Sequence, residues 1–215
     1  MPATGAVRWT VLVPVKALPR AKSRLAGFSP DADAHANLVR AMREDTLRAA
    51  RDAPNVVRVL CIGDRPSVEH DLVQERPGLN AAVDEGARHV RELWPDAAVA
   101  ALVGDLPALT ASELALALEA ATAHRRAFVA DSAGTGTTLL TATSGTALAP
   151  AFGPGSAERH ASRGVPLPAG PGLRQDVDTE SDLHAALLLG VGPRTTAAIA
   201  ATKRRSSAVH PERAS

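Results

Sequence analysis

The sequence of 215 residues has little of what secreted, membrane-spanning or nucleic-acid-coating proteins rely on. Its single cysteine, Cys61, cannot form a disulfide within the chain, so we expect a cytoplasmic protein. The 24 Lys and Arg residues nearly balance the 23 Asp and Glu residues, which disfavours broad binding to nucleic acid. No apolar run approaches the roughly 18 residues that a spanning helix needs, and no signal peptide begins the chain, so we expect no membrane association.

The sequence also lacks internal repeats and linkers rich in Gly and Ser, which favours a single domain. We expect this domain to span residues 1–204. A mobile polar tail is expected over residues 205–215, because the segment KRRSSAVHPERAS has little to bury. Cys61 lies in the apolar run VVRVLCIG and is interpreted as a small core residue.

Apolar runs alternate along the chain with segments in which apolar residues recur at helical spacing. This alternation predicts an α/β fold with a mainly parallel central sheet and helices on both faces. Asp31, Thr110 and Thr179 are predicted N-caps, and Gly190 is a predicted C-terminal stop. The predicted strands are Trp9–Val15, Val56–Ile62, Ala97–Val103, Ala127–Ala130, Thr138–Thr143 and Leu173–Val177; the predicted helices are Ala32–Ala53, Asn80–Leu93, Ala111–Ala123 and Thr179–Leu189.

Glycine is missing from the stretch VPVKALPRAKSRL, which covers the end of the first predicted strand and the loop after it. The stretch instead carries four cations, Lys16, Arg20, Lys22 and Arg24. Ligands of such a fold bind at the carboxyl ends of the strands, where the loops gather. The cations are therefore either solvated or hold a strongly negative group.

Acidic residues follow two other predicted strands. Asp105, in LVGDLPAL, is well placed to hold Mg²⁺, which prefers oxygen ligands, although an Asp that only makes a turn is the alternative. Asp176 and Asp178 alternate along the last predicted strand, so we expect only one of them to line the site easily. The run D-V-D-T also resembles the D-x-D-x-T of phosphatases, but that motif follows a first strand, which disfavours a phosphatase.

The segment GLNAA has residue types that suit a nucleotide. Gly78 allows close approach of the backbone to a ligand, and Asn80 offers a two-sided amide for reading a base edge. The small Ala81 and Ala82 leave room for a ring. The same pattern is also a common way to begin a helix.

Taken in order, six sets of motifs resemble one family: V-P-V-K with A-K-S-R-L, G-L-N-A-A, G-D-L-P-A-L, F-V-A-D with G-T-G-T, F-G-P-G-S-A-x-x-H, and D-V-D-T with S-D-L. The series runs from about Thr10 to Pro193 and resembles the guanylyltransferases of coenzyme F420 biosynthesis, the FbiD/CofC family, in their actinobacterial form. The resemblance implies a Rossmann-like nucleotidyltransferase sandwich.

This resemblance also implies a reaction. Members transfer GMP from GTP to a small phosphorylated C3 acid and release pyrophosphate. Phosphoenolpyruvate is the expected acceptor, giving enolpyruvyl-2-diphospho-5'-guanosine, with 2-phospho-L-lactate or 3-phosphoglycerate as alternatives. A separate transferase that loads the deazaflavin Fo is the implied functional partner.

Roles in phosphate and metal binding follow from the resemblance. Asp105 and Asp178 would hold Mg²⁺, with Asp176 in support or as the alternative ligand. The cations that would cradle the triphosphate are Lys16, Lys22 and Arg24. The acceptor phosphate is already a nucleophile, so the protein supplies position and charge.

The remaining implied roles concern the two substrates. Gly78, Asn80 and Ala81 would contact the nucleotide, with Gln74 and Glu75 either standing near the base or ending an edge strand. The implied acceptor-site residues are Thr137, Gly153 and Ser156. GPGSAERH is predicted to begin a helix whose first-turn amides bind an anion together with the Ser156 hydroxyl, unless Ser156 is only an N-cap. For Arg159 and His160, one turn on, a role at the surface is as good an interpretation as a role in the site.

Two further interpretations belong to other classes. A nucleotidyltransferase that loads molybdopterin usually begins with a glycine-rich L-A-A-G-x-G-x-R loop, which V-P-V-K does not match. A non-catalytic nucleotide-binding module would keep the fold without turnover. The presence of Lys16, Asp105 and the D-V-D-T carboxylates disfavours that module, because a pure binder has less need of paired metal ligands.

Overall fold

A central sheet of seven strands organises the protein, as a computed structural model that describes residues 7–15, 25, 28–29 and 31–209 shows. The strand order is β3-β2-β1-β4-β6-β5-β7. The strands are β1 (Trp9–Val15), β2 (Val56–Gly63), β3 (Leu72–Val73), β4 (Ala98–Leu102), β5 (Arg126–Ala130), β6 (Thr137–Ala142) and β7 (Val165–Pro166). β6 is antiparallel to both of its neighbours, and the other pairings are parallel. The prediction of a mainly parallel sheet is confirmed.

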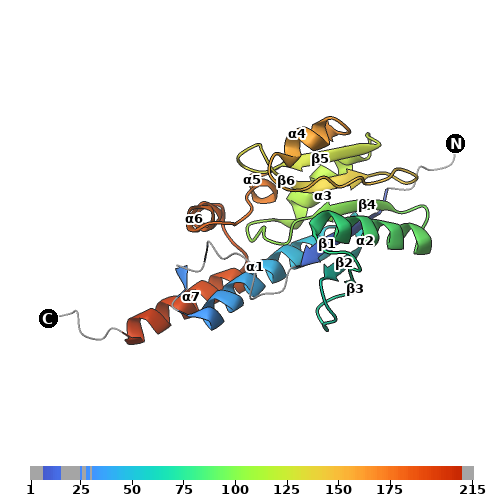
Figure 1. Ribbon diagram of the computed structural model, residues 1–215. Coiled ribbons are helices and arrows are strands. Elements are labelled where there is room, and N and C mark those ends of the chain that lie inside the picture. Colours follow the sequence, from blue (N-terminus) through green and yellow to red (C-terminus); the bar gives the residue numbers. More distant parts are fainter. Residues whose placement is uncertain (1–6, 16–24, 26–27, 30, 210–215) are drawn as a thin grey trace.

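Helices cover both faces of this sheet, also as predicted (Figure 1). They are α1 (Ala32–Asp52), α2 (Leu79–Leu93), α3 (Ala111–Ala121), α4 (Ser156–Ala161), α5 (Pro171–Arg174), α6 (Glu180–Leu189) and α7 (Pro193–Val209). Apolar residues of α1 and α3 pack on one face, and those of α2 and α4 on the other. A third cluster joins the outer side of α1 to α6 and α7, so α7 lies beside α1 (Figure 1).

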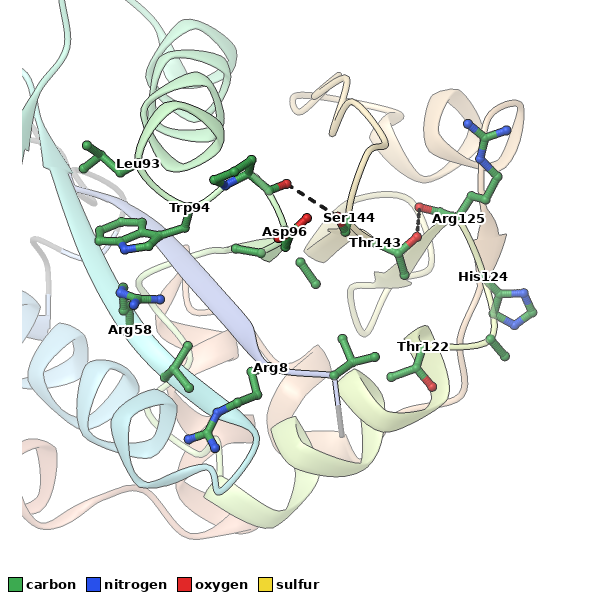
Figure 2. Close-up of a pocket in the computed structure, with 16 residues that line it drawn as sticks. Arg8, Arg58, Leu93, Trp94, Asp96, Thr122, His124, Arg125, Thr143 and Ser144 are labelled. Carbon is green, nitrogen blue, oxygen red and sulfur yellow. Dashed lines mark hydrogen bonds between the residues drawn. The ribbon is translucent and has the colours of Figure 1, made fainter. Parts of the chain in front are cut away.

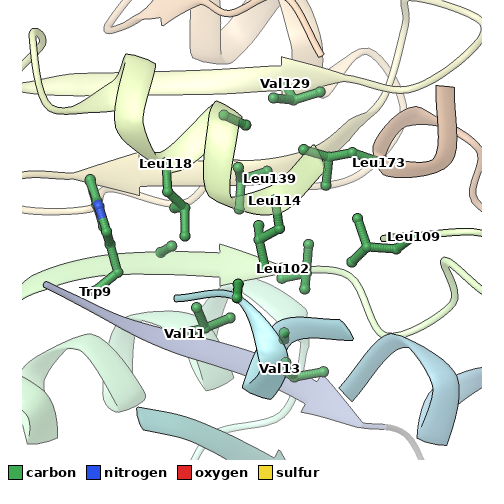
Figure 3. Packing of buried hydrophobic residues seen from close by; sticks show 14 of the residues in the cluster. Trp9, Val11, Val13, Leu102, Leu109, Leu114, Leu118, Val129, Leu139 and Leu173 are labelled. Carbon is green, nitrogen blue, oxygen red and sulfur yellow. The ribbon is translucent and has the colours of Figure 1, made fainter. Parts of the chain in front are cut away.

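The central strand β1 divides its side chains between the two faces. Trp9, Val11 and Val13 point into the cluster under α1 and α3, where they meet residues of β4 and α3 (Figure 3). Leu12 points into the cluster under α2. Because both faces are covered, β1 reads as a continuous apolar run instead of an alternating one. Cys61 of β2 lies in the first cluster, which confirms its interpretation as a core residue.

The predicted caps are confirmed. Asp31, Thr110 and Thr179 each accept a hydrogen bond from a backbone amide in the first turn of the helix that follows, and Gly190 ends α6 with a φ of 93°. Thr110 and Glu113 form a complete capping box.

The predicted strand Leu173–Val177 is wrong. Pro171 begins the short helix α5, because its fixed φ suits a first helical turn. Gly172 packs so closely that an added Cβ would lie 2.3 Å from the Ala108 carbonyl oxygen, and its amide donates to Glu113 Oε1 at 2.8 Å. Residues 175–178 then continue without regular structure.

Helix α7 has no counterpart among the predicted elements. Its backbone is helical to Val209, so it covers the start of the segment expected as a tail. Its N-terminus lies on Asp45 of α1, which is 2% exposed. The Asp45 carboxylate accepts the amides of Arg194 at 3.2 Å and Thr195 at 2.7 Å. A residue about 150 positions away in the chain therefore caps α7.

We expect Asp45→Ala to lower the free energy of unfolding by about 2 kcal/mol, because two helix amides lose their buried acceptor. Asp45→Asn keeps one carbonyl oxygen and should lose less. Chemical denaturation of the two variants and the wild type measures the effect. Equal stability of Asp45→Ala and the wild type would contradict the role of Asp45 as a cap.

Candidate active-site cleft

A cleft of about 830 Å³ lies at the carboxyl ends of β1 and β4. Its walls come from the end of β1, the loop after β4, the segment that leads into α2, the loop before β6, the loop before α4, and residues 176 and 178. This is the crevice in which open α/β sheets bind ligands. The cleft therefore brings together loops that are far apart in the sequence.

The Asp105 loop is held from below by α1. Leu106 donates its amide to Thr46 Oγ1 at 3.0 Å, and the Thr46 hydroxyl donates to the Met42 carbonyl at 2.9 Å. Gly104 sits close to β1, where an added Cβ would lie 3.3 Å from Val13 Cγ1. These contacts place Asp105 at the cleft wall.

Asp176 and Asp178 both line the same cleft, so the expectation that only one would do so is wrong. The alternation of side chains requires a strand, and here the chain turns at 178 into α6. Val177 between them is buried, and its amide donates to the Asp105 carbonyl at 3.1 Å. This backbone hydrogen bond sets the D-V-D-T segment beside the Asp105 loop.

The described walls of the cleft are strongly acidic. Their carboxylates are Asp64, Asp105, Asp131, Asp176 and Asp178. Within the part of the chain that the structure describes, no three His, Cys, Asp or Glu side chains gather closely enough to form a metal site by themselves. Polyphosphate would be repelled by such walls unless cations join them.

Of the lining side chains that the structure describes, only Arg43 is cationic. It lies on α1, is 9% exposed and pairs with Glu69 from the connection between β2 and β3. Sequence reasoning missed this residue. The sequence feature that could have indicated Arg43 is its position on the apolar face of α1, one turn after Val39 and one turn before Leu47.

The predicted phosphate-binding cations, Lys16, Lys22 and Arg24, lie outside the described residues. Val15, the residue before Lys16, lines the cleft.

The segment that begins α2 differs from the expectation, because Ala81 and Asn80 do not line the cleft. Gly78, with a φ of 105°, lines the cleft, as does Ala82, whereas Asn80 does not. The Asn80 amide instead accepts from Phe152 N at 2.7 Å and donates to Phe152 O at 3.1 Å. The amide assigned to a base edge thus ties α2 to the loop before α4. Gln74, the alternative residue, does line the cleft.

Buried Glu85 holds the backbone that leads to Gly78. Its carboxylate accepts the amides of Glu75 at 2.7 Å and Arg76 at 3.1 Å, and the Arg76 guanidinium at 2.8 Å. Burial by itself raises the pKa of Glu85, but the hydrogen bonds from Glu75 and Arg76 outweigh it and lower the pKa overall.

The loop before β6 is built around Asp131. Its carboxylate accepts the amides of Thr135 at 2.9 Å and Gly136 at 2.8 Å. A Cβ on Gly136 would lie 2.3 Å from Asp131 Oδ2, so a larger residue there would displace the Asp131 carboxylate. The next residue, Thr137, faces the cleft.

Gly153 and Ser156 also line the cleft, and the first two amides of α4, which the sequence predicts to bind an anion, have partners within the protein. The Ser156 amide donates to the Gly153 carbonyl, and the Ala157 amide donates to the Thr135 carbonyl, both at 3.0 Å. These two amides are therefore occupied within the protein. The Ser156 hydroxyl donates to Thr137 Oγ1 at 3.2 Å.

His160 is also not at the surface, because it is 1% exposed beneath this loop. Arg159 is exposed, and its guanidinium donates to the carbonyls of Ala151 and Pro154. Arg159 thereby braces the loop that carries Gly153.

A second hollow, of about 1040 Å³, lies at the opposite ends of the strands (Figure 2). The carboxyl ends of α2 and α3 border it, and Arg58 stacks over Trp94 at 4.0 Å. The hollow lacks the loops at the carboxyl ends of the strands, so the first cleft is the candidate site.

Solved structures place the fold among nucleotidyltransferases. A protein of Desulfovibrio desulfuricans G20 assigned as a nucleotide-diphospho-sugar transferase matches with a TM-score of 0.70, at 16% identity, over 94% of this chain and 96% of that one. A nucleotidyl transferase from Methanothermobacter matches with a TM-score of 0.54, at 15% identity, over 85% and 97%. The fold is thus that of a nucleotidyltransferase.

Sequence comparison narrows this class to a family. Residues 9–165 match the family described as "Guanylyl transferase CofC like". A phosphoenolpyruvate guanylyltransferase of Streptomyces scabiei is 50% identical over 90% of this chain and 97% of its own length, and one of Streptomyces coelicolor is 48% identical over 90% and 97%. The chain belongs to the CofC-like guanylyl transferase family. It is therefore a nucleotidyltransferase enzyme, and the recognised motifs are confirmed at the level of the family.

The helices of the described residues include none that is both long and apolar enough to cross a membrane.

A pH dependence follows from the lowered pKa of Glu85. A carboxyl group with a lowered pKa in the folded state stabilises the fold above its unfolded pKa of about 4.3, and this contribution is lost as the pH falls through the folded value. Glu85→Gln should therefore lower Tm most at pH 6 to 7, and the difference from wild type should shrink below about pH 4.3. Scanning calorimetry checks this. The exposed Glu92→Gln is the control and should show little difference at any pH.

Proposed function

We propose that this protein transfers GMP from GTP to phosphoenolpyruvate, releasing pyrophosphate and forming enolpyruvyl-2-diphospho-5'-guanosine, in coenzyme F420 biosynthesis. The observation that carries the proposal is one cleft that is lined by Asp105, Asp176 and Asp178 together with Thr137 and Ser156. The relatives of Streptomyces that bear the name phosphoenolpyruvate guanylyltransferase support the choice of acceptor. The product would pass to a transferase that loads deazaflavin Fo.

The residues of the cleft fit a magnesium ion. Mg²⁺ is bound by one or two carboxylates and takes its other ligands from water and substrate phosphates, so a complete protein cage is not needed. Asp105 would hold it together with Asp178 or Asp176, which the Val177 hydrogen bond sets nearby. When bound, Mg²⁺ neutralises charge on the phosphates that react.

Different residues of the chain would bind the triphosphate and the nucleoside of GTP. Lys16, Lys22 and Arg24, which follow Val15 at the cleft wall, would bind the triphosphate and the departing pyrophosphate. Gly78 and its neighbours would receive the nucleoside, with close approach allowed by the missing side chain.

The phospho-acid would lie between Thr137, Gly153 and Ser156, so that one of its phosphate oxygens attacks the α-phosphorus of GTP in line with the leaving pyrophosphate. The new bond joins that oxygen to the α-phosphorus, and the bond to the β-phosphate oxygen breaks. No proton needs to leave the nucleophile, which is already an anion.

The test is incubation of the purified protein with GTP and Mg²⁺ and, separately, phosphoenolpyruvate, 2-phospho-L-lactate or 3-phosphoglycerate, with mass spectrometry of the products. A GMP adduct with phosphoenolpyruvate is expected, and the partner transferase with Fo should consume it. An adduct formed only with another acid would overturn the choice of acceptor. Absence of any adduct, while GTP still binds, would favour the non-catalytic module.

Asp105→Asn should reduce turnover by at least a hundredfold, because the metal loses a charged ligand, while the fold remains intact. Steady-state rates and circular dichroism measure these two properties. Asp96→Asn, in the opposite hollow, is the matched control and should keep wild-type activity. An Asp105→Asn enzyme with most of its activity would remove Asp105 from the metal site.

A further inference from the structure

His160 is a buried imidazole with two defined partners next to the proposed acceptor site. Its Nδ1 lies 2.8 Å from Thr137 Oγ1, and its Nε2 accepts the Ala151 amide at 2.9 Å. The ring is 1% exposed and lies against Phe152, with centroids 5.2 Å apart. A side chain so placed has only one way to satisfy both contacts.

The Ala151 amide determines the tautomer. A backbone N–H can only donate, so Nε2 must present its lone pair, and the single proton of a neutral imidazole must be on Nδ1. Nδ1–H then donates to Thr137 Oγ1.

The surroundings keep the ring neutral. Burial, together with the positive charges of Arg159, Arg163 and Arg126, lowers the pKa of His160 to about 4. The rings of Phe128 and Phe152 are the other neighbours. At neutral pH the Nδ1–H tautomer is therefore the form present.

Two donors converge on the Thr137 hydroxyl oxygen. One is His160 Nδ1–H, and the other is the Ser156 hydroxyl at 3.2 Å. A hydroxyl oxygen has two lone pairs, so both are used. The Thr137 proton has no acceptor among the described residues, and Thr137 lines the cleft. That proton therefore remains available for a hydrogen bond to a ligand.

We propose that His160 is a positioning residue that makes Thr137 an obligatory hydrogen-bond donor to an anionic oxygen of the phospho-acid. The inference rests on the proposed function and adds a residue to its acceptor site. Because neither lone pair of Thr137 is available, a ligand group that donates a proton is disfavoured there. A fully ionised phosphate or carboxylate oxygen is the group that fits.

The first test does not depend on catalysis. The ¹⁵N shifts of the histidine rings are measured by NMR, and the His160 signals are identified by their loss in His160→Asn. A neutral ring with the proton on Nδ1 is expected throughout pH 5.5 to 8. An imidazolium at pH 7, or a proton on Nε2, would overturn the inference.

The second test is kinetic. His160→Leu removes the donor to Thr137, so the KM for phosphoenolpyruvate should rise about tenfold, the cost of one hydrogen bond in a buried site. The KM for GTP should stay within about twofold. His160→Asn, which keeps an N–H near Nδ1, should recover part of the loss. His124→Leu, in the opposite hollow, is the control and should change neither KM.

Thr137→Val distinguishes positioning from a merely structural role. If His160 acts through the Thr137 hydroxyl, His160→Leu should add little to the KM of a Thr137→Val enzyme. Additive effects, or an equal rise in both KM values with a lower Tm, would overturn the inference. A wild-type enzyme that transfers GMP to none of the acids would overturn the proposed function instead.

Discussion

One backbone hydrogen bond, from the Val177 amide to the Asp105 carbonyl, makes the acidic side of the cleft possible. It joins two segments about seventy residues apart, and it does so where neither is a strand. Asp105 is fixed in turn by Thr46 of α1, which accepts the Leu106 amide. Because α1 also packs against α6 and α7, the outer helices support the position of the carboxylates through α1. The proposed metal site is therefore a property of the whole fold.

Charge is the second constraint. Five carboxylates and one guanidinium line the described walls, an arrangement that repels phosphate by itself. In the sequence, a cation-rich segment follows immediately after Val15, and a magnesium ion would add two further positive charges. In the proposed function, the carboxylates would hold the metal and the cations would hold the phosphates.

In the loops before β6 and α4, the important property is which group donates and which accepts each hydrogen bond. Asp131 orders the loop through Gly136, Arg159 braces the loop through Gly153, and Asn80 ties that loop to α2. Each of these side chains forms its hydrogen bonds with backbone atoms. His160 and Ser156 instead converge on Thr137, which in the proposal would leave the Thr137 proton for the phospho-acid. Rigid loops of this kind reduce the reorganisation that binding would otherwise require.

Local sequence determined most elements of the fold: the apolar runs of five strands, the helical periodicities of α1, α2 and α3, and the capping residues Thr110 and Thr179, because these signals depend on near neighbours. The ordered motifs likewise identified the family. Tertiary structure alone decided that α7 is capped by Asp45, that Asp176 and Asp178 share one cleft with Arg43, and that His160 is buried against Thr137. It also decided that Asn80 and the first two amides of α4 have protein partners. Each of these depends on contacts between residues distant in the chain, which no local pattern records.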